Sequence, residues 1–153
     1  MLAGAFGLAL LAMLPVLIAR YPQMSDYPAH LARWHVMLNI GQNADLARFY
    51  RFTWEWTPNL GTDLLIRPLA ALFGLEAAGR AMVAVIPALL GLSFLATDLA
   101  LNRRIGAGAM LALATIWSPS LLMGFLNFSL AEALAFFAFA LWVRMAGIRW
   151  RPA

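Results

Sequence analysis

The sequence predicts an all-α polytopic membrane protein with about four transmembrane helices and one helical external loop, and three observations support this class. Of the 153 residues, 63% are hydrophobic and only 12% are charged, whereas charged residues make up about a quarter of a typical soluble domain. The charges are also clustered, because residues 2–19, 81–97 and 105–131 contain none. Uncharged apolar runs of roughly 18 residues have the length that a helix needs to cross hydrocarbon.

The same composition excludes several other classes of protein. The chain has no cysteine, so it is not a disulfide-stapled domain, and its high apolar content is not that of a disordered or collagen-like chain. A formal net charge of +4 would raise nucleic acid as a partner only if basic residues clustered on one solvated face. The arginines instead lie in short loops, so we expect membrane lipid and no nucleic acid as a partner.

The first predicted span covers residues 2–19 and ends at Arg20 and Tyr21, a cation and an aromatic residue where the membrane interface should lie. A secretory signal peptide is the competing interpretation. It fits less well, because the apolar region exceeds the usual 7 to 15 residues and no cation precedes it.

The other three spans are predicted at about 80–97, 106–121 and 125–143. Residues 105–143 would form a helix of about 58 Å if unbroken, nearly twice the thickness of the ~30 Å hydrocarbon core. The chain must therefore fold back, and the segments Ser118-Pro119-Ser120 and Gly124-Phe125-Leu126-Asn127 supply residues that break helices.

Arginine placement predicts the orientation of these spans. Five of the 11 arginines lie in the 98–106 loop and the C-terminal segment, with one acid nearby, whereas the six in residues 20–80 are mixed with five acids. The positive-inside rule then places both termini in the cytoplasm and residues 20–79 outside.

An amphipathic helix is predicted within this external loop, over about residues 27–40. Ser25 and Asp26 stand where an N-cap is expected, and apolar residues recur at helical spacing up to Trp34 and beyond, so we expect this helix to lie in the membrane interface with Trp34 as an anchor. Asp26, His30 and Arg33 share its other face.

Three interpretations of these polar residues remain open. Asp26 could serve only as a helix cap worth about 1 kcal/mol, with His30 and Arg33 on a solvated face. Asp26 could instead be a general base, tuned by partial desolvation, with Arg33 neutralising a phosphate. A divalent metal site with His35 is the third interpretation, but His30 and His35 diverge by about 140° around a helix, so the ligand spacing does not support a metal.

Two further segments of the loop have both a structural and a functional interpretation. Aromatic and charged residues alternate over residues 48–56, which is typical of an interfacial aromatic belt and also suits stacking on a sugar ring. Asn59 or Thr62 is predicted to cap a short helix extending to about Phe73, on which Asp63 and Arg67 have the spacing of an i, i+4 ion pair.

Glu132 is the one acid inside a predicted span, and an intramembrane carboxylate is a functional candidate by default. The span still inserts, because the surrounding apolar residues outweigh an insertion cost of ~3 kcal/mol. Glu132 could take part in a site, or it could reach water or stay protonated beside Ser129.

Several short motifs occur together along residues 20–143: Asp26-x-Pro28-x-His30-Leu31-x-Arg33, Tyr50, Trp54, Pro58-Asn59-Leu60-x-x-Asp63, Ala78-Gly79-Arg80 and Gly124-Phe125-Leu126-Asn127-Phe128. Together they resemble a group of uncharacterised bacterial multi-span proteins of the GT-C glycosyltransferase superfamily type. The resemblance implies a polyprenyl-phosphate-linked sugar as donor and an acidic catalytic residue in the first external loop. It also implies a location in the inner membrane of a bacterium. Asp26 is the position that matches this acid, and His30 and Arg33 follow as its neighbours.

The chain departs from that superfamily in two respects. Many members have adjacent acids in this loop, whereas Tyr27 and Pro28 follow Asp26. Members also have roughly twice as many spans, so we expect this chain to be the N-terminal part of a larger enzyme and to be inactive in isolation. The alternative is a non-enzymatic membrane subunit, an assembly factor or a transporter component, in which Asp26 is a cap and Glu132 contacts a partner helix.

Overall fold

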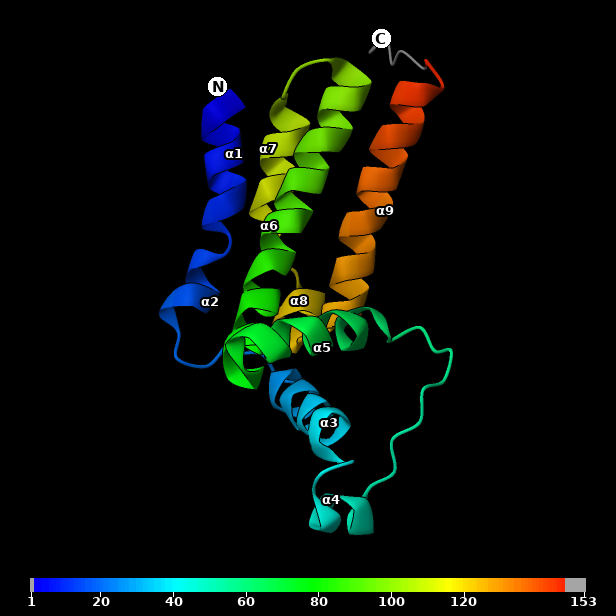
Figure 1. The fold of residues 1–153 in the computed structure, drawn as a ribbon. Coiled ribbons are helices and arrows are strands. Elements are labelled where there is room, and N and C mark those ends of the chain that lie inside the picture. The colour runs from blue at the N-terminus through cyan, green and yellow to red at the C-terminus, as the bar shows by residue number, and fades with distance from the viewer. Residues whose placement is uncertain (1, 148–153) are drawn as a thin grey trace.

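The computed structural model describes residues 2–147, and all of the regular structure in this range is α-helical (Figure 1). The predicted all-α class is therefore confirmed. The helices, in chain order, are α1 (Leu2–Leu11), α2 (Leu14–Ile18), α3 (Tyr27–Asn39), α4 (Ala44–Phe49), α5 (Gly61–Phe73), α6 (Leu75–Asn102), α7 (Ala107–Ala114), α8 (Pro119–Met123) and α9 (Leu126–Met145).

The helices form a bundle and a smaller group at one end of it. Helix α6 lies at the centre and contacts α1, α2, α3, α5, α7 and α9. The start of α1 and the end of α9 lie at the same end of the bundle, and α3, α4 and α5 lie at the opposite end (Figure 1). The predicted external loop is thus largely helical, and its helices lie together at one end of the bundle.

Two helices in the described range, α6 and α9, are long and apolar enough to cross a membrane. Their 28 and 20 residues correspond to about 42 and 30 Å at 1.5 Å per residue. Helix α6 contains the predicted span at 80–97 and continues through Pro87. Helix α9 contains the predicted span at 125–143 except for its first residue.

The prediction of four spanning helices is not supported. Residues 2–18 form two short helices, and the proline at position 15 explains the break, because it cannot donate to the carbonyl four residues earlier and its ring clashes with that carbonyl. Residues 107–123 divide in the same way: α7 ends at Ala114, and Ser118 caps a separate helix that begins at Pro119. At 8 to 10 residues, α1 and α7 would measure only about 12 to 15 Å.

The predicted turn at Gly124 is confirmed. Gly124 has φ = +87° and ends α8, with its N–H donating to the Leu121 carbonyl and the Phe125 N–H donating to the Ser120 carbonyl. This left-handed conformation suits glycine. Helix α9 begins two residues later, at Leu126.

The amphipathic helix is also confirmed, but its apolar face packs on protein. Trp34 is fully buried and Tyr27 nearly so, and a Cβ at Gly79 of α6 would lie only 3.1 to 3.3 Å from atoms of Tyr27, Leu31 and Trp34. Trp34 is therefore a core residue and not an interfacial anchor. The missing side chain at Gly79 allows α3 to pack closely across α6.

The closest contact at a glycine in the bundle is at Gly91, also in α6. A Cβ there would lie 2.9 Å from the Ala9 Cβ and from the Ile116 Cδ1, so α1 and the α7–α8 connection both approach α6 at this point. Gly4 and Gly7 of α1 have open space around them. The close approach is therefore made possible by glycine in the central helix.

The connection between α3 and α5 contains one helix that the sequence pattern did not predict. Helix α4 is capped by the Asn43 side chain, which accepts hydrogen bonds from the N–H groups of Asp45 and Leu46. The following residues 50–60 form no helix, and Tyr50, Trp54 and Trp56 are exposed in this segment. It runs from α4 back to α5, to one side of α3 (Figure 1).

Candidate functional site

A cavity of about 330 Å³ lies where the start of α3, the start of α5 and the α8–α9 turn meet. Its polar lining residues come from segments far apart in the sequence: Asp26, His30, Arg33, Asn59, Asp63 and Asn127. Phe125, Leu126 and Phe128 line the remaining wall. The cavity thus brings acidic, basic and amide side chains together beside an apolar wall, and convergent polar groups in a pocket mark a candidate binding site.

Asp26 occupies the N-cap position of α3, but its side chain makes no capping hydrogen bond. Its backbone is held instead: the N–H donates to the Met123 carbonyl over 3.0 Å, and the carbonyl accepts from the His30 N–H. A Cβ at Gly124 would lie 3.0 Å from the Asp26 Cβ. The α8–α9 turn therefore fixes the backbone of Asp26, while its carboxylate has no hydrogen-bond partner among residues 2–147. The hydrogen bond that the cap interpretation requires is not formed.

The expected desolvation of Asp26 is not observed. Its side chain is exposed where it lines the cavity, because it lies beside the turn and not inside the bundle. A carboxylate in this position remains hydrated and accessible to a ligand.

His30 lies one turn after Asp26 and is half-buried. Its Nε2 is 3.1 Å from the Gly124 carbonyl oxygen, and a carbonyl can only accept, so Nε2 carries the proton. In the neutral imidazole Nδ1 is then the atom with a free lone pair. The ring also stacks at a tilt on Trp34, with centroids 5.5 Å apart, which holds its orientation.

Arg33 is committed to Asp63. Its Nε and Nη2 both donate to Asp63 Oδ2, over 2.8 and 2.6 Å, and the indole Nε1 of Trp34 donates to Oδ1 over 3.0 Å. Asp63 is 1% exposed and Arg33 50% exposed. The predicted Asp63–Arg67 pair is therefore wrong: the tertiary packing of α3 on α5 gives Asp63 a better partner than its own helix does.

Asn127 fixes the start of α5 from another helix. Its Oδ1 accepts from the Thr62 N–H over 2.8 Å, and the position before α5, Leu60, provides no side-chain cap. Neither Asn59 nor Thr62 therefore caps this helix, contrary to prediction. The first-turn donors of a helix need an external acceptor, and here Asn127 supplies one across the cavity wall.

Glu132 does not line the cavity. It is half-buried on α9, and the buried Ser129 hydroxyl has no hydrogen-bond partner within residues 2–147. The alternative in which Glu132 is held beside Ser129 therefore has no hydrogen bond to support it. His35 is exposed and next to Asn39. No group of three or more metal-ligating side chains occurs in the described range.

Of the predicted site residues, Asp26, His30 and Arg33 lie together and Glu132 lies apart. The sequence pattern gave no chemical role to Asp63 or Asn127, although both stand in the motifs of the resemblance. A comparison with protein-family models, with curated proteins and with solved structures finds no match to this chain.

Proposed function

We propose that the chain is the N-terminal, membrane-embedded part of a GT-C-like glycosyltransferase that uses a polyprenyl-phosphate-linked sugar. Asp26 takes the proton of an acceptor hydroxyl, whose oxygen attacks the anomeric carbon of the sugar. The bond from that carbon to the phosphate oxygen breaks, and its electron pair leaves with the lipid phosphate. We further propose the inner membrane as its location, with both termini in the cytoplasm.

The free carboxylate of Asp26 is the observation that carries this proposal. An acid at an N-cap ordinarily accepts a hydrogen bond from a first-turn N–H group. Asp26 makes no such bond, and it lines a cavity. A general base must be able to reach a substrate proton directly, and an exposed carboxylate on a backbone fixed by the α8–α9 turn meets that requirement.

Arg33 can stabilise the leaving phosphate, but Asp63 offsets part of its positive charge. Two of its nitrogens bind Asp63, so the pair is nearly neutral as a unit, and Nη1 remains to donate to a phosphate oxygen at the cavity. The Asp63 carboxylate orients the guanidinium. We therefore assign Arg33 a substrate-binding role at the phosphate.

The test is sugar transfer by the full-length protein in lipid vesicles, with Asp26→Asn against Asp45→Asn as the control on exposed helix α4. We expect Asp26→Asn to lower turnover by about 100-fold or more, which is the scale of a lost general base, and Asp45→Asn to leave it unchanged. Asp26→Asn should not alter thermal unfolding, because no side-chain hydrogen bond is lost. Unchanged turnover would remove Asp26 from the mechanism.

The second candidate is a non-enzymatic membrane subunit, and the exposed apolar surface of α9 favours it. Leu134, Phe139, Leu141 and Trp142 are all exposed on this helix, so it offers a surface to lipid or to partner helices. In that case Asp26→Ser would leave both assembly and function intact. Loss of transfer with normal assembly would exclude this candidate.

A further inference from the structure

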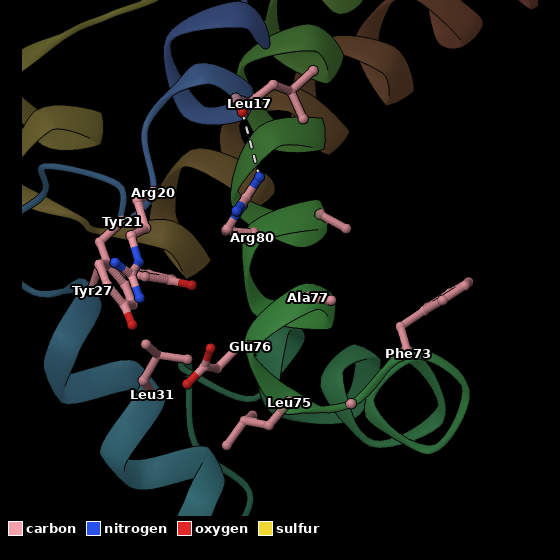
Figure 2. Close-up of a pocket in the computed structure, with 12 residues that line it drawn as sticks. Leu17, Arg20, Tyr21, Tyr27, Leu31, Phe73, Leu75, Glu76, Ala77 and Arg80 are labelled. Atoms are coloured by element: carbon pink, nitrogen blue, oxygen red, sulfur yellow. Dashed lines mark hydrogen bonds between the residues drawn. The ribbon is translucent and has the colours of Figure 1, made fainter.

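A second and larger cavity, of about 710 Å³, lies on the other side of the α3 start, between the end of α2 and the α5–α6 junction (Figure 2). Its charged lining residues are Arg20, Glu76 and Arg80, and Tyr21 and Tyr27 contribute hydroxyl-bearing rings. It shares no lining residue with the cavity at Asp26.

Both arginines of this cavity lack an acidic partner within the described residues, where the one salt bridge joins Arg33 to Asp63. Glu76 and Arg80 have the i, i+4 spacing that favours an ion pair on a helix, yet they do not pair. Arg80 runs toward Leu17 and donates to its carbonyl over a long 3.4 Å, while Glu76 points the other way, toward Leu31 (Figure 2). Positive and negative groups are thus held apart across one cavity.

The cavity also has an apolar side at the end of a span-length helix. Leu17, Phe73 and Leu75 line it, and Leu75 is the first residue of α6. Phe73 is exposed, as are the neighbouring Leu72 and Ile18. A basic cavity with apolar walls, at the point where a span begins, has the chemistry that holds a lipid headgroup.

We infer that this cavity binds a phospholipid whose headgroup carries both a phosphate and a primary amine. The guanidinium groups of Arg20 and Arg80 donate to the phosphate oxygens, and the Glu76 carboxylate accepts from the ammonium group. An anionic headgroup without an amine would leave Glu76 facing negative charge. The Tyr27 hydroxyl is uncharged at neutral pH, as a tyrosine ordinarily is, and burial raises its pKa further, to about 12.

This inference rests on the proposed membrane location and not on the chemistry of Asp26. Phosphatidylethanolamine, phosphatidylglycerol and phosphatidylcholine with identical acyl chains are the probes. All three carry the phosphate, but phosphatidylglycerol lacks the amine, and the quaternary ammonium of phosphatidylcholine has no N–H to donate to Glu76. Binding to the full-length protein in detergent is measured by native mass spectrometry. Glycerophosphoethanolamine, the headgroup without acyl chains, is the soluble competitor.

We expect phosphatidylethanolamine to bind at least fivefold more tightly than the other two lipids. Arg20→Gln and Arg80→Gln should each weaken that binding at least fivefold, and Glu76→Gln should abolish the preference for the amine over phosphatidylglycerol. Arg67→Gln, which changes an exposed arginine outside the cavity, is the matched control and should have no effect. Arg20 is exposed, so its variant tests the inference even if Arg80→Gln fails to fold.

Equal binding of the three lipids, or a preference unchanged by both Arg20→Gln and Glu76→Gln, would overturn the inference. Competition by glycerophosphoethanolamine as effective as by the lipid would identify a soluble ligand and overturn the lipid source. Asp26→Asn should leave the lipid preference intact. Failure of sugar transfer with a retained preference would therefore contradict only the glycosyltransferase proposal.

Discussion

Arg33 on α3 and Asp63 on α5 form an ion pair, 2.6 Å between Nη2 and Oδ2, that joins two helices on opposite sides of a 21-residue connection. Asp63 is almost fully buried, and the adjacent Trp34 donates to its second oxygen. A buried carboxylate is tolerated when its oxygens are hydrogen-bonded. Arg33 and Trp34, which are consecutive residues of α3, donate hydrogen bonds to both oxygens of Asp63. These bonds fix the rotation of α3 about its axis, and that rotation places Asp26 and His30 at the cavity.

Removing Arg33, the partner of Asp63, should lower the free energy of unfolding more than neutralising Asp63 itself. Arg33→Met leaves the buried carboxylate with only the indole N–H, and we expect a loss of about 3 kcal/mol in the free energy of unfolding. Asp63→Asn keeps an acceptor for Trp34 and should cost about 1 to 3 kcal/mol. Denaturant unfolding in detergent measures both, with the exposed Arg67→Met as control; equal effects of Arg33→Met and Arg67→Met would contradict the account.

The cap that Asn127 gives to α5 can be tested by amide exchange. Asn127→Ala removes the acceptor of the Thr62 N–H, so we expect faster hydrogen exchange at Thr62 and a loss of about 1 kcal/mol in stability. Asn127→Asp should preserve protection, because it keeps the oxygen and adds negative charge at a helix N-terminus. Asn43→Ala, which removes the cap of α4, should leave Thr62 exchange unchanged; unaltered exchange in Asn127→Ala would contradict the cap.

Gly91→Ala should destabilise the bundle by about 1 to 3 kcal/mol through overpacking. The new Cβ would meet both the Cβ and the Cα of Ala9, and the backbone atom cannot rotate away. Gly7→Ala makes the same change in α1, where nothing lies within 4 Å, and should stabilise slightly because alanine is the better helix former. Thermal unfolding of the two variants should therefore shift in opposite directions, and a shared direction would argue against the close contact.

Tyr27 should make stability fall at high pH. Burial raises its pKa from 10.0 to about 12, with Arg80 opposing that rise, so the folded state favours the neutral phenol. That contribution is complete below pH 10, where the unfolded chain is also neutral, and it is lost as pH rises through 12. The difference in unfolding free energy between the wild type and Tyr27→Phe should shrink over this range; a constant difference would mean that Tyr27 is not buried as described.

The sequence pattern predicted the elements whose causes are local. Helical spacing of apolar residues identified α3, and Gly124 identified the turn before α9. The same reasoning assigned Asp63 to Arg67, because they are four residues apart on one helix. It could not see Arg33, since that contact depends on how two helices pack across the connection between them.

The span count shows the same division. The lengths of the uncharged apolar runs predicted four spans, but the length of a run does not show that a proline at position 15 removes a backbone donor and ends a helix within it. The prediction that Trp34 anchors the helix in the membrane interface was wrong for a related reason. An amphipathic pattern predicts that one helix face is buried, but it does not show whether lipid or protein covers that face.

By itself, the sequence determined the all-α class, the two long apolar helices and the placement of Asp26, His30 and Arg33 on one helix face, since these follow from composition and the 3.6-residue period. Only the tertiary structure decided which carboxylate is free. Asp26 and Asp63 are both acids near a helix start. Helix α3 packs so that Arg33 and Trp34 donate hydrogen bonds to Asp63, whereas the side chain of Asp26, beside Gly124, makes no capping hydrogen bond. Burial demands hydrogen-bond partners and exposure does not, and burial is a property of the packed chain.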